Sequence, residues 1–160
     1  MRKLKLYLDT SMISYLYADD TLDKVSDTNK LWSDFIGNKY ELFISPVVMD
    51  ELEKCAEPKR GLLYHKLEQI QFQTLNKTDE IETLAREYIK GGVLKEKNLD
   101  DCFHIAFAVV YDCDIIVSWN FKHLVNFKTM SKVKIVNAIH QYREISIVSP
   151  TMLLEEEDEA

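Results

Sequence analysis

The chain has 160 residues, of which 46% are hydrophobic and 29% charged, and its formal net charge is −7 at pH 7. This length suits one domain with a sizeable buried core, and no apolar run approaches the ~20 residues of a membrane span. Because no signal-peptide pattern is present either, the composition excludes a membrane protein, indicates a cytoplasmic location and gives no support for general nucleic-acid binding.

Strand and helix patterns alternate along the chain. The first part predicts a strand over residues 5–8, a helix over 26–36, a strand over 41–45, and helices over 46–55 and 58–69. The second part predicts a strand over 72–75, helices over 78–90 and 100–111, a strand over 115–118, a helix over 132–142, a strand over 145–148 and a helical turn from Pro150. We expect a single domain over residues 1–154 and a frayed acidic tail over 155–160.

This alternation predicts an α/β fold. We expect a three-layer α/β/α sandwich around a mostly parallel sheet of about five strands. The short strands are apolar on both faces, as a sheet covered by helices on both sides requires. Ligands of such sheets bind outside the carboxyl ends of the strands, where the strand order reverses. Asp9 directly follows the first strand, so it stands where function is expected.

Several common α/β chemistries are excluded by missing motifs. None of the four glycines follows the first strand, which excludes a dinucleotide-binding fingerprint and a P-loop. The chain has neither a G-x-S-x-G nucleophile elbow nor an H-E-x-x-H zinc helix. Position 11 is Ser11, where a haloacid-dehalogenase-type phosphotransferase needs a second acid. Cys55, Cys102 and Cys113 form no C-x-x-C pair and are expected to be reduced, packed thiols.

A set of oxygen-bearing side chains remains, at matching positions along the predicted sheet. Asp9 follows the first strand, Glu51 lies in the helix after the second, Asp100 and Asp101 begin a buried helix, and residues 118–120 follow the fourth strand. If the first and fourth strands are neighbours, these side chains converge at one edge of the sheet. Hard oxygen ligands gathered there suit Mg²⁺ or Mn²⁺, and such a cation would relieve the repulsion between crowded carboxylates.

Each of these residues also has a purely structural explanation. Asp9 could cap a following helix, and Asp100 and Asp101 could cap the helix that they begin and interact with its dipole. Glu51 could lie on a solvated face, and Asn120 could be a turn residue. A single position decides little, so the inference depends on their joint placement.

Two histidines stand close to these acids in the sequence. His104 lies one helical turn after Asp100 and Asp101, where a buried core histidine is the usual explanation. His123 follows the fourth strand and could bind a phosphate or lie on the surface.

The chain resembles the PIN-domain family, especially the VapC-like ribonucleases of bacterial toxin–antitoxin systems. The resemblance is carried by four stretches, YLDTSMISYL, FISPVVMDELEKC, DDCFHIAFAVVYDCDIIVSWNFKHL and ISIVSPTMLL, which together span nearly the whole chain. The D-x-x-H-I-A block followed by S-W-N-F-K-H-L is the most specific part. The resemblance implies an α/β/α sandwich whose acidic residues bind Mg²⁺ or Mn²⁺ and cut RNA phosphodiester bonds with a metal-activated water.

Four catalytic positions carry over from the family motifs. Asp9 matches the first family acid, Glu51 the second, and Asp101 the third, because it stands three residues before His104. The fourth acid of many relatives falls at Asn120, which keeps an oxygen ligand but lacks the negative charge. This departure implies a weaker second metal site, or one completed only by the substrate phosphate.

The resemblance also implies roles for these side chains. Asp9 and Asp101 would hold the principal metal ion, with Glu51 bound through water or completing its coordination. Asn120, Ser118 and Thr10 would orient the water, the metal or the scissile phosphate. The basic residues expected to steer RNA are Lys54, Lys59, Arg60, Lys122, His123 and Lys128.

VapC-like proteins are commonly dimers that a small antitoxin silences, so the resemblance implies a homodimer and an antitoxin partner as well as an RNA substrate. Two other interpretations stay open. The Asn120 departure could mark a non-catalytic module that binds RNA or protein, and Asp9 could instead be the nucleophile of a phosphatase.

Overall fold

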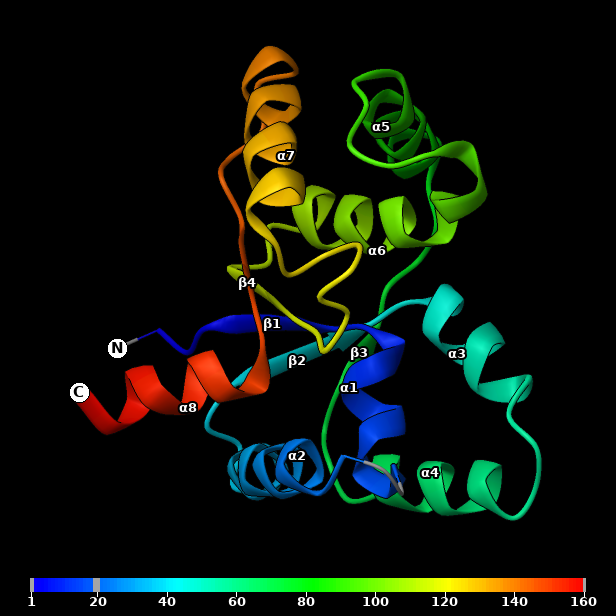
Figure 1. The fold of residues 1–160 in the computed structure, drawn as a ribbon, viewed down its shortest axis with the longest axis vertical. Helices are drawn as coiled ribbons and strands as arrows, with labels where there is room; N and C mark the ends of the chain where they lie inside the picture. Colours follow the sequence, from blue (N-terminus) through cyan, green and yellow to red (C-terminus); the bar gives the residue numbers. More distant parts are fainter. Residues whose placement is uncertain (1, 19–20, 160) are drawn as a thin grey trace.

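The protein forms a five-stranded parallel sheet with the strand order β3-β2-β1-β4-β5 (Figure 1). The computed structural model describes residues 2–18 and 21–159. The strands are β1 (Lys5–Leu8), β2 (Glu41–Ile44), β3 (Gln73–Thr74), β4 (Ile115–Val117) and β5 (Ser146–Val148). The predicted parallel sheet and its five strands are therefore confirmed.

Helices cover both faces of the sheet. They are α1 (Thr10–Ser14), α2 (Leu22–Ile36), α3 (Pro46–Glu53), α4 (Lys59–Leu67), α5 (Asp79–Lys90), α6 (Leu99–Val110), α7 (Phe127–Ile139) and α8 (Pro150–Glu159), with short 3₁₀ turns at Tyr15–Tyr17 and Glu96–Asn98. One layer contains α1, α2, α4 and α8, and α5, α6 and α7 lie on the opposite side (Figure 1). This is the predicted three-layer sandwich. Within the described ranges, no helix combines the length and the apolar character needed to cross a membrane.

The strand order reverses at β1. From β1 the chain adds β2 and then β3 on one side, and it later places β4 and β5 on the other side. The last residue of β1, Leu8, is paired in register with the last residue of β4, Val117. Asp9 and Ser118 therefore leave the sheet next to each other, as the sequence predicted on the condition that these strands are neighbours.

The core extends through the sheet into α6. Leu6, Tyr7 and Leu8 have no exposed surface, because helices cover both faces of β1. Eight consecutive residues of α6, Cys102 to Val109, are buried, which agrees with the apolar pattern of this helix. Cys102 and Cys113 are buried and Cys55 is half-buried, and all three are free thiols, as expected.

Two helices begin earlier than the sequence predicted. The predicted helix over 132–142 is α7, which runs over Phe127–Ile139 and is capped by Asn126, whose side chain accepts a hydrogen bond from the Thr129 amide. The predicted helix over 26–36 begins at Leu22. Phe127 is 83% exposed and Leu22 is 77% exposed, so the first turns of both helices lack the buried apolar positions from which a helix is recognised.

The expectation of a frayed tail is wrong for residues 155–157. These residues continue α8, whose last residue is Glu159. Glu157 accepts a hydrogen bond of 2.8 Å from the Tyr40 hydroxyl and forms an ion pair of 3.1 Å with Lys39. The acidic end is thus attached to the body through the segment between α2 and β2.

Candidate active site

Asp9 is a buried carboxylate at the point where the strand order reverses. Its side chain is 3% exposed and accepts three hydrogen bonds. Oδ1 accepts from the Met12 amide at 3.1 Å and the Ser11 hydroxyl at 2.7 Å, and Oδ2 accepts from the Ser118 hydroxyl at 2.6 Å. Asp9 is therefore the cap of α1, and the capping explanation is correct. Burial still raises the pKa of Asp9, because the hydrogen bonds and the nearby His104 only partly offset the loss of water.

Two serine hydroxyls connect Asp9 to the loop after β4. Ser118 Oγ accepts a hydrogen bond from the Asn120 amide at 2.9 Å, and Ser11 Oγ accepts one from the Trp119 amide at 2.8 Å. Each hydroxyl thus donates to Asp9 and accepts from the loop. The sequence predicted a role for Ser118. The role of Ser11 was not predicted, because it depends on a contact with Trp119, over a hundred positions away.

Trp119 fixes the position of this loop. Its side chain is 4% exposed, and its indole Nε1 donates to Thr28 Oγ1 on α2 at 2.8 Å. The Lys24 ammonium lies 5.7 Å from the Trp119 ring and 5.3 Å from the Phe121 ring, at cation–π distance. The loop that carries Asn120 and His123 is therefore attached to α2.

Glu51 is held by a buried chain of hydrogen bonds that begins in the sheet. Its Oε1 accepts from the Thr10 hydroxyl at 2.9 Å and from His104 Nε2 at 2.9 Å. His104 Nδ1 in turn lies 2.7 Å from the Tyr7 hydroxyl, which lies 2.7 Å from Ser45 Oγ. Neither Tyr7 nor Ser45 was a candidate from the sequence.

The pKa values indicate an ion pair between His104 and Glu51. Burial lowers the pKa of His104, but Glu51, Asp9 and Asp101 outweigh burial and raise it. Burial raises the pKa of Glu51, but His104, Thr10 and Lys54 outweigh burial and lower it. His104 thus interacts electrostatically with all three acids, rather than being an inert core residue.

Asp101 is the residue of the Asp100–Asp101 pair that faces the site. Its Oδ2 accepts a hydrogen bond of 2.9 Å from His123 Nδ1, whereas Asp100 is exposed. Burial raises the pKa of Asp101, although His104 and His123 act in the opposite direction. His123 is 23% exposed at its side chain, so it is neither a free surface residue nor fully buried.

Asn120 has the turn role that its position allowed. Its Oδ1 accepts a hydrogen bond of 2.9 Å from the His123 amide. This bond shapes the turn that presents the His123 ring to Asp101.

The three acids surround His104, but they do not form a ready-made metal cage. Among the described residues, no three His, Cys, Asp or Glu side chains are grouped so that they could hold a metal ion. Each carboxylate bonds protein donors instead, as described for Asp9, Glu51 and Asp101. The donor set still fits Mg²⁺ or Mn²⁺ chemically, because Mg²⁺ is commonly bound by one or two carboxylates together with waters and substrate phosphate.

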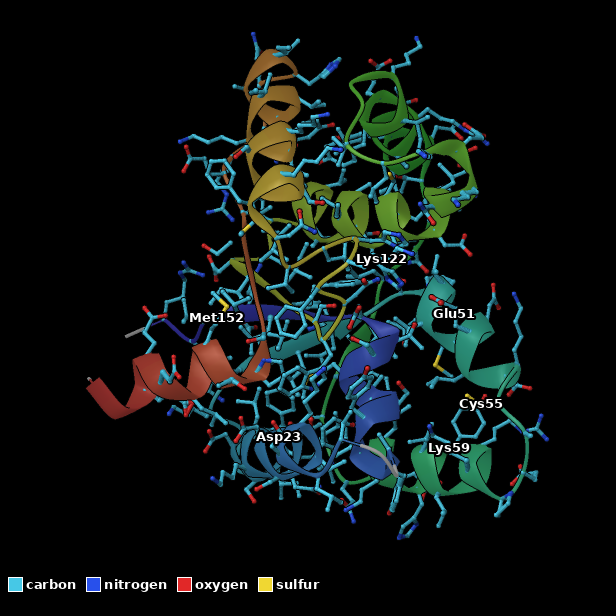
Figure 2. The ribbon with its side chains drawn as sticks, viewed as in Figure 1. Asp23, Glu51, Cys55, Lys59, Lys122 and Met152 are labelled. Atoms are coloured by element: carbon cyan, nitrogen blue, oxygen red, sulfur yellow. The ribbon has the colours of Figure 1, made fainter. Side chains whose placement is uncertain are left out.

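The six basic residues expected to steer RNA fall into two groups. Lys122, His123 and Lys128 line a cavity beside Asp101. Lys54, Lys59 and Arg60 lie at the far end of α3 and the start of α4, and Figure 2 shows Lys59 there, well separated from Lys122. Arg60 is bonded to Glu57 at 3.1 Å, so its charge is already partly neutralised.

Solved structures with the same fold are bacterial VapC and VapBC proteins. VapC20 of Mycobacterium tuberculosis, described as a Sarcin-Ricin loop cleaving toxin, is 14% identical with a TM-score of 0.57, over 74% of this chain and 92% of that one. VapBC-1 of nontypeable Haemophilus influenzae is 14% identical with a TM-score of 0.58, over 92% of this chain and 99% of that one. VapBC2 of Rickettsia felis, bound to a promoter DNA fragment, is 13% identical with a TM-score of 0.56, over 91% of this chain and 98% of that one.

Sequence comparison gives the family. No curated protein sequence matches this chain. The PIN-domain family model matches residues 6–122, which include Asp9, Glu51, Asp101 and Asn120. With this match over most of its length and with the fold described above, the chain belongs to the PIN-domain family.

Proposed function

We propose that this protein is a metal-dependent endoribonuclease of the VapC-like type, which hydrolyses RNA phosphodiester bonds. The observation that carries the proposal is that His104 bonds Glu51 at 2.9 Å and is near enough to Asp9 and Asp101 for both to raise its pKa, with Asp9 at the edge where the strand order reverses. Ligands of α/β sheets bind at that edge. The family match and the description of VapC20 as a Sarcin-Ricin loop cleaving toxin support the same chemistry.

Asp9 and Asp101 would hold a Mg²⁺ or Mn²⁺ ion, with Glu51 bound directly or through water. Such an ion lowers the pKa of a bound water and offsets negative charge on phosphoryl oxygens. His104 and Thr10 keep Glu51 ionised and oriented.

Ser118 acts on Asp9, since its hydroxyl donates to that carboxylate. Asn120 positions His123 through its Oδ1, and its Nδ2 amide supplies a donor for a phosphate oxygen.

The Asp100–Asp101 pair offers a matched control. Purified wild type, Asp9→Asn, Asp101→Asn and Asp100→Asn are incubated with end-labelled structured RNA in Mn²⁺ or in EDTA, and the products are separated by size. We expect wild type and Asp100→Asn to cleave RNA in Mn²⁺ only. Asp9→Asn and Asp101→Asn should be inactive in both conditions.

Two results would contradict this proposal. The first is intact RNA after prolonged incubation of the wild type with Mn²⁺, and the second is cleavage that survives in Asp9→Asn. A covalent phosphoryl group on Asp9 after exposure to a phosphate monoester would instead support a phosphatase.

A non-catalytic RNA- or protein-binding module is the second candidate. It is favoured by the lack of a ready-made cage within the described residues and by the engagement of Asn120 Oδ1 in a turn. Such a module would bind RNA in Mn²⁺ and leave it unchanged.

We further propose that the protein forms a homodimer and is bound by a small antitoxin. Two of the similar structures are VapBC proteins, which supports an antitoxin partner. Light scattering of the purified chain tests the dimer. Co-purification of a short protein that suppresses cleavage tests the antitoxin.

A further inference from the structure

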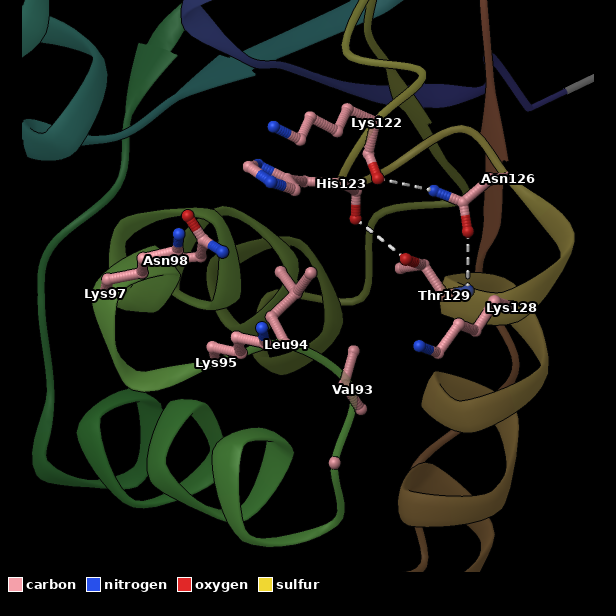
Figure 3. A pocket seen from close by; sticks show the side chains of 11 residues that line it. Val93, Leu94, Lys95, Lys97, Asn98, Lys122, His123, Asn126, Lys128 and Thr129 are labelled. Atoms are coloured by element: carbon pink, nitrogen blue, oxygen red, sulfur yellow. Dashed lines mark hydrogen bonds between the residues drawn. The ribbon is translucent and has the colours of Figure 1, made fainter.

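An open cavity of about 700 Å³ lies directly beside Asp101. One wall is the segment between α5 and α6, and the other is the loop after β4 with the start of α7 (Figure 3). Lys95, Lys97, Lys122, His123 and Lys128 are among the residues that line it. The volume is in the range of about 300–1,000 Å³ that ligand sites occupy. We call this cavity the lysine pocket.

The lysine pocket is basic in a chain that is acidic overall. Lys95, Lys97, Lys122 and Lys128 line it, and no Asp or Glu among the described residues does. The acid within the same segment, Glu96, forms an ion pair of 2.8 Å with Arg86 of α5 instead. The net charge of the whole chain is −7, so the gathering of four lysines here is local.

The pocket lysines differ from the arginines and from several other lysines of the protein. Each of the four arginines forms an ion pair with a carboxylate, as do Lys30, Lys39, Lys77, Lys90 and Lys134. Over the described residues, Lys95, Lys97, Lys122 and Lys128 have no carboxylate within 4.0 Å. Their charges are therefore available to an external anion.

We propose that the lysine pocket binds the phosphate backbone of single-stranded RNA next to the bond that is cut. This inference rests on the proposed function and adds to it the surface that holds the strand. His123 belongs to both places, because its ring bonds Asp101 and also lines the pocket. A strand whose phosphate lies at Asp101 would therefore be next to the pocket.

The chemistry of the walls fits a nucleotide better than an isolated anion. Val93 and Leu94 give the pocket an apolar part, and Asn98 contributes an amide. An apolar surface with nearby amides and cations suits a base and its phosphate together, since unpaired bases are bound by apolar contacts and edge hydrogen bonds. The continuity with the acid site favours RNA over an acidic protein segment.

Binding without metal tests the pocket separately from cleavage. A fluorescein-labelled single-stranded RNA of about twelve nucleotides is titrated with protein in EDTA, and anisotropy is followed between ~50 and ~200 mM salt. The test variant is Lys95→Ala/Lys97→Ala, and the control is Lys3→Ala/Lys66→Ala, which removes two positive charges elsewhere that, over the described residues, also have no carboxylate within 4.0 Å. Circular dichroism checks that both variants are folded.

We expect Lys95→Ala/Lys97→Ala to weaken RNA binding about tenfold at low salt. The slope of log affinity against log salt should fall by about 1.4, because each phosphate contact with a single strand contributes about 0.7. In Mn²⁺ the same variant should raise KM and leave kcat unchanged. The control should remain within about twofold of wild type in affinity.

Three results would overturn the inference. The first is equal affinity of the test variant and the control, and the second is no measurable RNA binding by the wild type. The third is displacement of the RNA by a glutamate-rich peptide of equal length as efficiently as by unlabelled RNA, which would assign the pocket to an acidic protein. Lysine-dependent binding without cleavage leaves the pocket assignment standing and contradicts only the nuclease proposal.

Discussion

The two ends of the acid site are built differently. At one end, Asp9 is 3% exposed and accepts hydrogen bonds from an amide and two hydroxyls. At the other end, the Asp101 side chain is 20% exposed and accepts a hydrogen bond from His123, a residue of a loop. Asp9 is held by the sheet and by α1, whereas Asp101 is bonded by a side chain of the loop after β4.

This difference assigns the two acids different parts in binding a cation. The hydroxyls of Ser11 and Ser118 keep Asp9 oriented, and Oδ2, which accepts one hydrogen bond, has a lone pair left for a metal ion. A metal ion at Asp101 competes with the hydrogen bond from His123 Nδ1 for the same carboxylate. We therefore expect Asp9 to bind as a prearranged ligand and Asp101 to exchange His123 for the ion.

Asp9→Asn should produce the largest effect on function. Cleavage should fall by more than about 100-fold, the upper end of the loss found for residues that only support a metal ligand. The free energy of unfolding should rise or remain unchanged. Burial raises the pKa of Asp9, so the ionised carboxylate destabilises the metal-free fold at neutral pH.

The pH dependence of Asp9→Asn checks this reasoning. A raised pKa means that the folded state binds the proton more tightly, so the contribution of Asp9 to stability is present at low pH and is lost as pH rises. The free energy of unfolding of the variant, measured with urea, should rise relative to that of wild type as pH rises from about 4 to about 7. A variant that is inactive and also much less stable at pH 7 would point to structural damage.

His104→Ala should cause the largest loss of stability. It leaves the Glu51 carboxylate and the Tyr7 hydroxyl without their shared partner, and removing one member of a buried ion pair costs about 3–5 kcal/mol. Because Glu51 is 35% exposed at its side chain, water compensates in part and we expect about 3 kcal/mol. Urea unfolding with and without Mn²⁺ measures it.

Tyr7→Phe is the graded control for His104→Ala. It removes only the hydroxyl that links His104 to Ser45, and such a hydrogen bond is worth about 1 kcal/mol. A loss as large as that of His104→Ala would mean that the hydrogen bonds of the Tyr7 hydroxyl, and not the contact of His104 with Glu51, dominate.

His123→Ala and Ser118→Ala should change metal affinity in opposite directions. Removing His123 frees Asp101 from a bond of about 1 kcal/mol, so Mn²⁺ should bind about fivefold more tightly. Ser118→Ala releases Asp9 from one of its supports and should weaken Mn²⁺ binding about tenfold. Calorimetric titration without RNA measures both. A change in the same direction for both variants would contradict the difference between the two ends.

The order of the elements could be predicted from the sequence because it depends on local patterns. The apolar runs of β1, β2 and β4 predict strands, and the spacing of the apolar residues of α5 predicts a helix. Asp9 and Asp101 could be proposed for the site because each stands at the end or the start of a recognisable element.

Contacts over long separations could not be predicted in this way. Tyr7 reads as an ordinary strand residue, and only the folded chain brings its hydroxyl to His104, 97 positions away. Ser11 supports Asp9 because it also accepts from Trp119, 108 positions away. The site's supporting hydrogen bonds therefore depend on tertiary packing, whereas the acids themselves follow from element boundaries.

Asp34→Asn should give the smallest effect, at a place where two acids meet without a histidine between them. Burial and the neighbouring Glu157 raise the pKa of Asp34 to about 6, next to the contact between α2 and α8. The folded chain then takes up a proton that the unfolded chain releases above pH ~4, so this contribution to stability declines between about pH 4 and 6. The amide of the variant cannot ionise, and its unfolding free energy relative to wild type should rise over that interval and stay constant above it. The rise should be less than about 1 kcal/mol, because Asp34 is partly exposed and solvent screens the pair.

Urea unfolding at pH 4, 5, 6 and 7 would measure this difference. Parallel curves for the two proteins would mean that Lys39, which also pairs with Glu157, already neutralises the contact. Neighbouring acids at the surface would then be stable without a buried histidine, whereas Glu51 in the site is bonded to His104.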